Sequence, residues 1–233
     1  MKKTIICFVT LILILSCNDS KKGSLTVNGT IEGLKKGTLY LQKYKDTAIV
    51  SVDSILLNGD SNFVLIDEIE SPEIYYIALD KILEEKISFF AEKGVINVTT
   101  KLAKFSTSAI ITGSKNNDIL AEHKAMTRQF NGKKLDLVKE KFEAQRINDT
   151  ALISKIERNE DNLLKRRYLY TTNFAVNHAD SEVAPYLAIT ELYYANIKLL
   201  DTINNSLPKK IKTSKYGLEL ERFIKSIKNN SVD

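Results

Sequence analysis

The sequence predicts an α+β protein, in which an N-terminal antiparallel β-sandwich or barrel-like sheet is followed by a C-terminal α-helical region. Between residues 24 and 113, short apolar and β-branched runs recur between turn residues, and several alternate apolar with polar positions. After residue 113, apolar residues recur at helical spacing over longer stretches. The chain has 233 residues. Chains longer than about 150 residues bury roughly 70% of their surface, so a core can form here without disulfides.

The first predicted strand begins at Ser24, and its apolar residues Leu25 and Val27 lie on one face because successive side chains alternate across a strand. The strands that follow, each ended by turn residues, are expected at 37–44, 48–57, 63–66, 74–79, 86–91, 95–100 and 108–112. Asn58-Gly59 tolerates positive φ at both positions. We therefore expect the strands on either side of this pair to form a hairpin.

The helical region begins at Ser114, which is placed to cap a helix that runs to Asn131 and ends at Gly132. Further helices are expected over 134–146, from 149 or 150 to about 177, after Ser181, and after Ser214. No internal repeat interrupts either half.

The N-terminus has the pattern of a secretory signal peptide, because Lys2 and Lys3 precede an uncharged apolar run over residues 4–15. This run is shorter than the about 20 residues that a membrane-spanning helix needs. It ends in Ile14-Leu15-Ser16-Cys17, which resembles the lipobox of bacterial lipoproteins. The resemblance implies cleavage between Ser16 and Cys17 and lipidation of Cys17. The alternative is an ordinary cysteine after an ordinary signal peptide.

These features divide the chain into a lipoprotein signal peptide (1–16), a flexible tether (17–23), an antiparallel β domain (24–113) and a helical region (114–233). Cys7 lies in the leader, so cleavage after residue 16 leaves 217 of the 233 residues with Cys17 as their single cysteine. With its sulfur acylated, no thiol remains for a disulfide or a Cys-x-x-Cys site. We expect a membrane anchor through lipid. By analogy with the sorting of known lipoproteins, the resemblance implies that Asn18 after the lipid-bearing cysteine favours the outer membrane, facing the periplasm.

The charges of the sequence do not indicate nucleic-acid binding. Without Lys2 and Lys3, the 34 basic residues fall to 32 against 29 acidic ones. Acids and bases alternate along the chain, which is typical of solvated helix faces. We expect no nucleic-acid partner.

No catalytic or cofactor motif is recognisable. The sequence contains no Gly-x-Ser-x-Gly elbow and no Gly-rich phosphate loop. His123 lies on the expected buried face of its helix and is interpreted as structural. His178, Asp180 and Glu182 are a conceivable zinc set, but a histidine at a helix C-terminus needs no metal. We expect no catalytic residue, no metal and no cofactor.

Two tyrosine pairs, Tyr75-Tyr76 and Tyr193-Tyr194, are candidates for lining a ligand groove. The alternative is core packing or the rim of an interface, and the sequence favours this alternative. In a strand, Tyr75 and Tyr76 must face opposite sides. We therefore expect one of them in the core and the other on the surface.

Three motifs, in this order, resemble a known module. They are Ile111-Thr112-Gly113-Ser114, then Asp180-Ser181-Glu182-Val183-Ala184-Pro185-Tyr186, then Ser214-Lys215-Tyr216-Gly217-Leu218-Glu219-Leu220. Together with the lipobox, they resemble the uncharacterised N-terminal domain that precedes the thioredoxin-like domain in TlpA-type thiol-disulfide oxidoreductases. In those relatives the thioredoxin-like domain follows shortly, with its Cys-x-x-Cys, whereas this sequence ends at Asp233. The chain thus resembles the accessory module alone, and the redox chemistry does not carry over.

The sequence therefore predicts a non-catalytic, lipid-anchored cell-envelope protein that acts as a binding or interaction module. The alternative is an accessory subunit of an envelope thiol-disulfide redox system that works with a separate thioredoxin-like protein.

Overall fold

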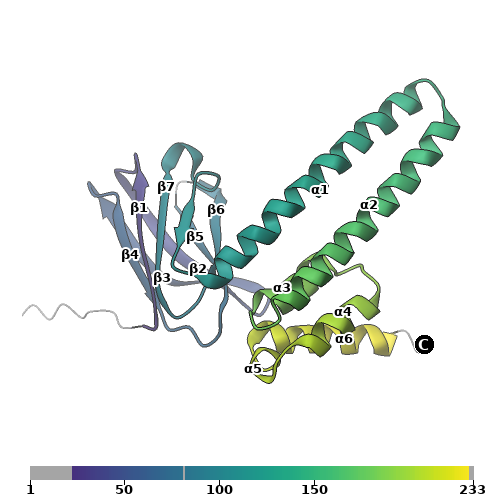
Figure 1. The fold of residues 1–233 in the computed structure, drawn as a ribbon. Coiled ribbons are helices and arrows are strands. Elements are labelled where there is room, and N and C mark those ends of the chain that lie inside the picture. Colours follow the sequence, from purple (N-terminus) through teal and green to yellow (C-terminus); the bar gives the residue numbers. More distant parts are fainter. Residues whose placement is uncertain (1–22, 81, 231–233) are drawn as a thin grey trace, which may run out of the picture.

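The computed structural model describes residues 23–80 and 82–230, and these form a two-sheet β-sandwich followed by helices (Figure 1). Ser16 and Cys17 lie outside the described residues. One sheet contains, in spatial order, β4 (Asn62–Asp67), β1 (Leu25–Glu32), β7 (Gly94–Lys101) and β8 (Ile110–Thr112). The other contains β3 (Ala48–Asn58), β2 (Lys36–Lys45), β5 (Glu73–Leu79) and β6 (Ile82–Ala91). A short 3₁₀-helix, Leu102–Lys104, follows β7. The predicted α+β layout is confirmed.

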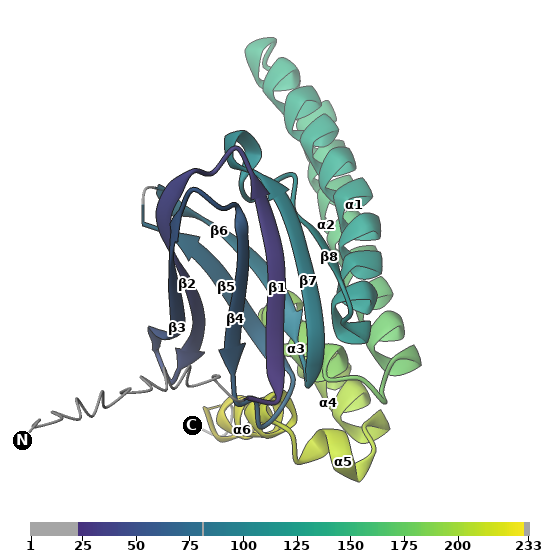
Figure 2. The ribbon, with the colours of Figure 1, turned by 90° about the vertical axis from the view of Figure 1, so that its left-hand side faces the viewer.

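The sandwich core lies between the two sheets and is built from the alternate residues of each strand. Leu25 and Val27 of β1 are fully buried, whereas Thr26 between them is partly exposed. Leu39 and Leu41 of β2 face them from the second sheet. Figure 2 shows the β4-β1-β7-β8 sheet from outside, with no helix over this face.

Two features of the sheet differ from the predictions. β1 pairs with β7 in parallel, so the sandwich is not wholly antiparallel. The predicted hairpin around Asn58-Gly59 is also wrong, because β3 pairs with β2, and β4 pairs with β1 in the other sheet. Gly59 does adopt a positive φ of 97°, and its N–H donates to the Lys35 carbonyl at 2.7 Å. The turn therefore carries the chain from one sheet to the other, which brings Phe63 into the core from the opposite side.

The C-terminal half consists of six helices: α1 (Lys115–Arg146), α2 (Thr150–Asn177), α3 (Val183–Glu191), α4 (Ile197–Ser206), α5 (Lys209–Lys212) and α6 (Lys215–Asn230). α1 and α2 form a long antiparallel hairpin whose far end projects away from the sandwich, while α3–α6 cluster at its base (Figure 1). None of the helices in residues 23–80 and 82–230 is both long and apolar enough to cross a bilayer.

Side chains cap these helices largely where the sequence indicates. Ser114 Oγ accepts from the Asn117 N–H at 3.0 Å, and Asp149 Oδ1 accepts from the Leu152 N–H at 2.9 Å. The prediction that Gly132 ends the first helix is wrong, because α1 continues through it to Arg146. A glycine costs only about 1 kcal/mol in a helix interior, and the packing and capping of a 32-residue helix outweigh that cost. The sequence did not indicate α4 or α5.

A third cluster of buried residues joins the sandwich to the helices. Ile74 of β5 and Phe90 of β6 pack there against Leu120, Phe174 and Leu187 from α1, α2 and α3. Phe90 is completely buried. This cluster fixes the helices against one end of the β3-β2-β5-β6 sheet. The candidate site lies beside the cluster.

Candidate binding site

A groove runs along the junction between the β3-β2-β5-β6 sheet and the C-terminal helices. It consists of two adjoining pockets of about 650 Å³ and about 800 Å³, which share Tyr44, Asp46 and Lys215. β2 and β5 form one wall, and α3 and α6 form the other. Pockets of this size are typical of small-molecule or peptide sites. We refer to these two pockets together as the junction groove.

Four tyrosines from four different elements line the junction groove: Tyr44 of β2, Tyr76 of β5, Tyr186 of α3 and Tyr216 of α6. The rings of Tyr44 and Tyr76 meet edge to face at 5.9 Å between centroids, and those of Tyr186 and Tyr216 lie 5.1 Å apart. Phe90 lies beneath the second pair, 5.6 Å from Tyr186 and 5.8 Å from Tyr216. Ring contacts with Phe90 therefore hold Tyr186 and Tyr216 in place, whereas Tyr44 and Tyr76 contact each other.

Tyr216 links the two walls directly, because its hydroxyl accepts a hydrogen bond from the Ile74 backbone N–H at 3.0 Å. Burial raises the pKa of Tyr216 well above its ordinary value of 10.0. Burial likewise raises the pKa of Tyr186 to about 12, with smaller contributions from Tyr76 and Glu191. Both phenols thus remain protonated at physiological pH and offer hydrogen-bonding hydroxyls rather than charge.

A network of charged groups forms one end of the junction groove. Lys43 Nζ donates to Asp67 Oδ2 at 2.7 Å and to the Tyr75 hydroxyl at 2.8 Å, and that hydroxyl donates to the same Asp67 oxygen at 2.6 Å. Glu73 pairs with Lys215 at the start of α6, and Lys215 Nζ also donates to the Tyr44 carbonyl at 3.3 Å. Burial and the Asp67 hydrogen bond raise the pKa of Tyr75. Tyr75 therefore stays protonated in this network, where its hydroxyl accepts from Lys43 and donates to Asp67.

The prediction that Tyr75 and Tyr76 face opposite sides is confirmed: Tyr75 is fully buried in the sandwich, whereas Tyr76 lines the junction groove. The other pair, Tyr193-Tyr194, lies away from the groove on the surface, where the Tyr193 ring stacks on Phe223 at 4.9 Å. Strand alternation in the sequence indicated that one of Tyr75 and Tyr76 would lie on the surface. No sequence pattern indicated Tyr44, because only the tertiary fold, in which Lys215 of α6 donates to the Tyr44 carbonyl, makes that residue part of a site.

A second polar network connects the end of β6 with the start of α1 and the segment before α3. Asn116 at the start of α1 donates to Glu92 after β6, and Ser181 Oγ donates to Asn116 Oδ1 at 2.6 Å. Ser181 also accepts from the Val183 N–H at 3.1 Å, although the N-cap position of α3 is Glu182. Burial raises the pKa of Glu182. The motifs at Gly113-Ser114, Ser181 and Tyr216 thus all help to fasten the helices to the sandwich.

The structure places both histidines in structural roles. His123 is buried, and its Nε2 lies 3.0 Å from the Thr171 hydroxyl, with Tyr170 stacked on the ring at 5.7 Å. His178 Nδ1 lies 2.9 Å from the Phe174 carbonyl, whereas Asp180 is near Lys115. No three His, Cys, Asp or Glu side chains of the described residues are grouped so that they can hold a metal ion.

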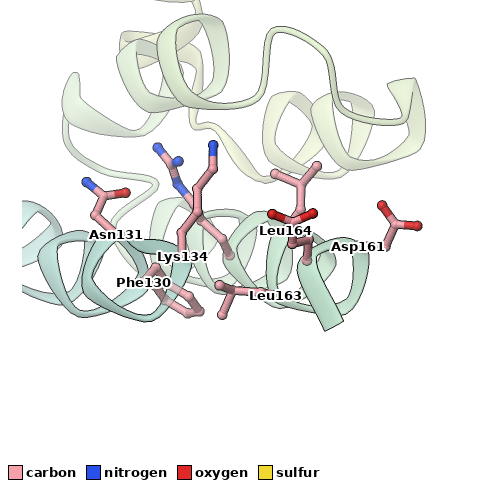
Figure 3. A pocket seen from close by; sticks show the side chains of 8 residues that line it. Phe130, Asn131, Lys134, Asp161, Leu163 and Leu164 are labelled. Atoms are coloured by element: carbon pink, nitrogen blue, oxygen red, sulfur yellow. The ribbon is translucent and has the colours of Figure 1, made fainter. Parts of the chain in front are cut away.

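A separate pocket of about 330 Å³ lies on the α1–α2 hairpin, outside the junction groove (Figure 3). Asn131 and Lys134 of α1 and Leu164 of α2 point to the same side of the hairpin, whereas Phe130 and Leu163 lie lower, between the helices. Arg167 of α2 also lines this pocket and forms an ion pair with Glu191 of α3.

The comparison with known protein families matches the N-terminal part of the chain. The search of curated proteins gives no match. Residues 25–120 match the model of an uncharacterised family, the domain of unknown function DUF4369. The matched residues comprise all eight strands and the first turns of α1, so the sandwich of this protein is similar to that domain, and most of the helical half lies outside the match.

Proposed function

We propose that this protein is a non-catalytic binding module, tethered to the cell envelope through lipid on Cys17, that holds a ligand in the junction groove. The observation that carries the proposal is the convergence of four tyrosines from four elements on one groove. Tyrosine combines a large apolar face with a polar tip, and it is enriched at binding surfaces for this reason. The tether is supported by the lipobox-like sequence at residues 14–17.

The charges of the groove indicate the class of ligand. The lining of the two pockets carries both signs of charge: Asp46, Glu68, Glu70, Glu73 and Glu219 are acidic, and Lys43, Lys45, Lys215 and Arg222 are basic. A groove with both signs of charge and aromatic walls suits an extended peptide segment, which offers apolar side chains, amides and charges of either sign. It does not suit a polyanion, because the acidic groups would repel it.

Photocrosslinking tests the groove assignment in the native envelope. A benzophenone amino acid replaces Tyr44 on the groove rim, where the side chain is 44% exposed, and in a matched variant it replaces Tyr194, which is 87% exposed and outside the groove. We expect the Tyr44 variant to capture peptide-bearing adducts that mass spectrometry identifies and that disappear with Tyr76→Ala. Equal adducts from both positions, or none from Tyr44, would contradict the proposal.

The tether is tested by the intact mass of the protein extracted from native membranes. We expect residues 1–16 to be absent and Cys17 to carry a diacylglyceryl group, and we expect Cys17→Ser to release the protein into the soluble fraction. An unacylated native chain, or one that keeps its leader, would refute the anchor and leave the groove proposal standing.

A second candidate is an accessory subunit that works with a separate thioredoxin-like enzyme. Its support is the resemblance of the sequence motifs to the module that precedes such domains. The adducts crosslinked at Tyr44 distinguish the two candidate functions. The accessory-subunit function requires a thioredoxin-like protein among these adducts.

A further inference from the structure

The distal half of α1 carries an exposed apolar stripe. Leu135, Val138 and Phe142 are 55%, 45% and 66% exposed. They are three and four residues apart, which places them on one side of the helix. Large apolar residues that lie singly on a surface need no explanation, but a contiguous row of them marks an interaction site.

The stripe reaches the pocket on the α1–α2 hairpin that Figure 3 shows. Asn131, which lines that pocket, lies one turn before Leu135 on the same side of α1. Across the pocket, α2 contributes Leu164, which is 44% exposed. The row of Leu135, Val138 and Phe142 therefore adjoins this pocket, whose lining mixes apolar residues with charged ones: Phe130, Leu163 and Leu164 with Asn131, Lys134, Glu160, Asp161 and Arg167. We call the row together with Leu164 the hairpin stripe.

Basic residues flank the hairpin stripe on both sides. At 100° per residue, Lys134 and Lys141 lie along one flank, and Lys139 and Arg146 lie along the other. Lys141 pairs with Glu157 and Glu160 of α2, and Arg146 pairs with Glu143. Lys134 and Lys139 form no ion pair within residues 23–80 and 82–230 and remain available to a partner. The acidic residues of this segment, Asp136, Glu140 and Glu143, lie on the opposite half of the helix.

This arrangement favours a helix as the occupant. A row spaced by three and four residues is the narrow seam along which two helices interlock, and the residues beside the seam contact the flanks of the partner helix. A second copy of α1 would place lysines against lysines in either direction.

We propose that the hairpin stripe docks an amphipathic helix of a partner protein whose apolar seam is flanked by acidic residues. This surface is separate from the junction groove, so it is a second binding function. Lys134 and Lys139 select the partner by charge, and Leu135, Val138 and Phe142 supply the apolar contact.

The test uses the mature chain with Cys17→Ser and two synthetic helical peptides that share a leucine seam, one with glutamate and one with lysine at the flanking positions. Fluorescence anisotropy at low salt measures their affinities. We expect the glutamate peptide to bind at least about tenfold more tightly, with a difference that shrinks as salt screens the charges. Val138→Asp should abolish binding, and the double variant Lys134→Glu/Lys139→Glu should reverse the preference. Leu169→Asp on α2, an equally exposed leucine outside the stripe, is the control and should bind normally.

Three outcomes would overturn the proposal. The first is equal affinity for the two peptides or no binding of either. The second is a dimer in sedimentation equilibrium that Phe142→Asp dissociates, which would assign the stripe to a second copy of the chain. The third is binding to phosphatidylglycerol vesicles that Phe142→Asp abolishes, which would assign it to a lipid surface. None of them bears on the junction groove, because no groove residue is changed.

Discussion

The two ends of α1 show how one helix is used in two ways. Near its N-terminus, Ile119, Leu120 and His123 are buried against the sandwich and α2. Further along the helix, Leu135 and Phe142 follow the same helical spacing but are exposed. The first end fastens the hairpin, and the second presents an apolar surface. Apolar periodicity in a sequence therefore predicts a helix face that packs against something. It does not say whether the packing partner belongs to the same chain or to another molecule.

The comparison is tested most sharply by truncating two phenylalanines, Phe90 of β6 in the buried cluster at the junction and Phe142 in the exposed stripe. Phe90→Ala removes a completely buried ring that supports Tyr186 and Tyr216, and we expect the free energy of unfolding to fall by about 3–5 kcal/mol. Phe142→Ala at the 66% exposed position should change it by no more than about 0.5 kcal/mol. Urea denaturation measures both. A large loss in Phe142→Ala would show that the stripe is covered within the chain.

The sequence predicted those features of the fold that depend on neighbouring residues. Alternation located the strands, and Ser114 and Asp149 marked helix starts that the structure confirms. The pairing of β4 with β1 could not be predicted, because the Asn58-Gly59 turn suits a hairpin equally well. Only the core shared by the two sheets determines which strand β4 pairs with. The junction groove could not be predicted for the same reason: Tyr44 and Tyr216 are far apart in sequence, and tertiary packing alone brings them to opposite walls of one groove.

Two glycines in helices sharpen the comparison further. In Gly217 at the junction, an added Cβ would lie 2.0 Å from the Ile211 carbonyl oxygen, so Gly217→Ala should destabilise the protein by about 1–3 kcal/mol. In Gly132 within the hairpin, an added Cβ would meet nothing within 4 Å. There, Gly132→Ala should stabilise by about 1 kcal/mol, because alanine is the better helix former.

Thermal and urea unfolding of both variants check these signs. Gly132→Ala also tests the correction to the sequence prediction. If Gly132 ended one helix and the chain turned there, an alanine would be strained and the variant would lose stability. A gain requires the continuous α1 that the structure shows.

The smallest expected effect is a pH dependence of the folding stability that arises from His123, near the N-terminus of α1. Burial is the main cause that lowers the pKa of His123 from its ordinary value of 6.5. Below that value, the unfolded chain binds a proton that the folded chain does not, so stability falls as the pH drops from above 6.5 toward the lower folded pKa. A difference of one bound proton between the folded and unfolded chains changes the free energy of unfolding by at most about 1.4 kcal/mol per pH unit.

The comparison of the parent chain with His123→Gln isolates this contribution, since glutamine keeps a side chain that can hydrogen-bond to Thr171. Glu182 and Glu219 act in the opposite direction, because burial raises their pKa values and the folded chain then holds protons that the unfolded chain releases. Their effect is the same in both proteins and cancels in the difference. We expect the stability loss between pH 7.5 and 5.5, measured by urea denaturation, to be smaller in His123→Gln. An identical loss would mean that His123 accepts its proton without unfolding, and that this end of the hairpin opens to water as readily as the distal one.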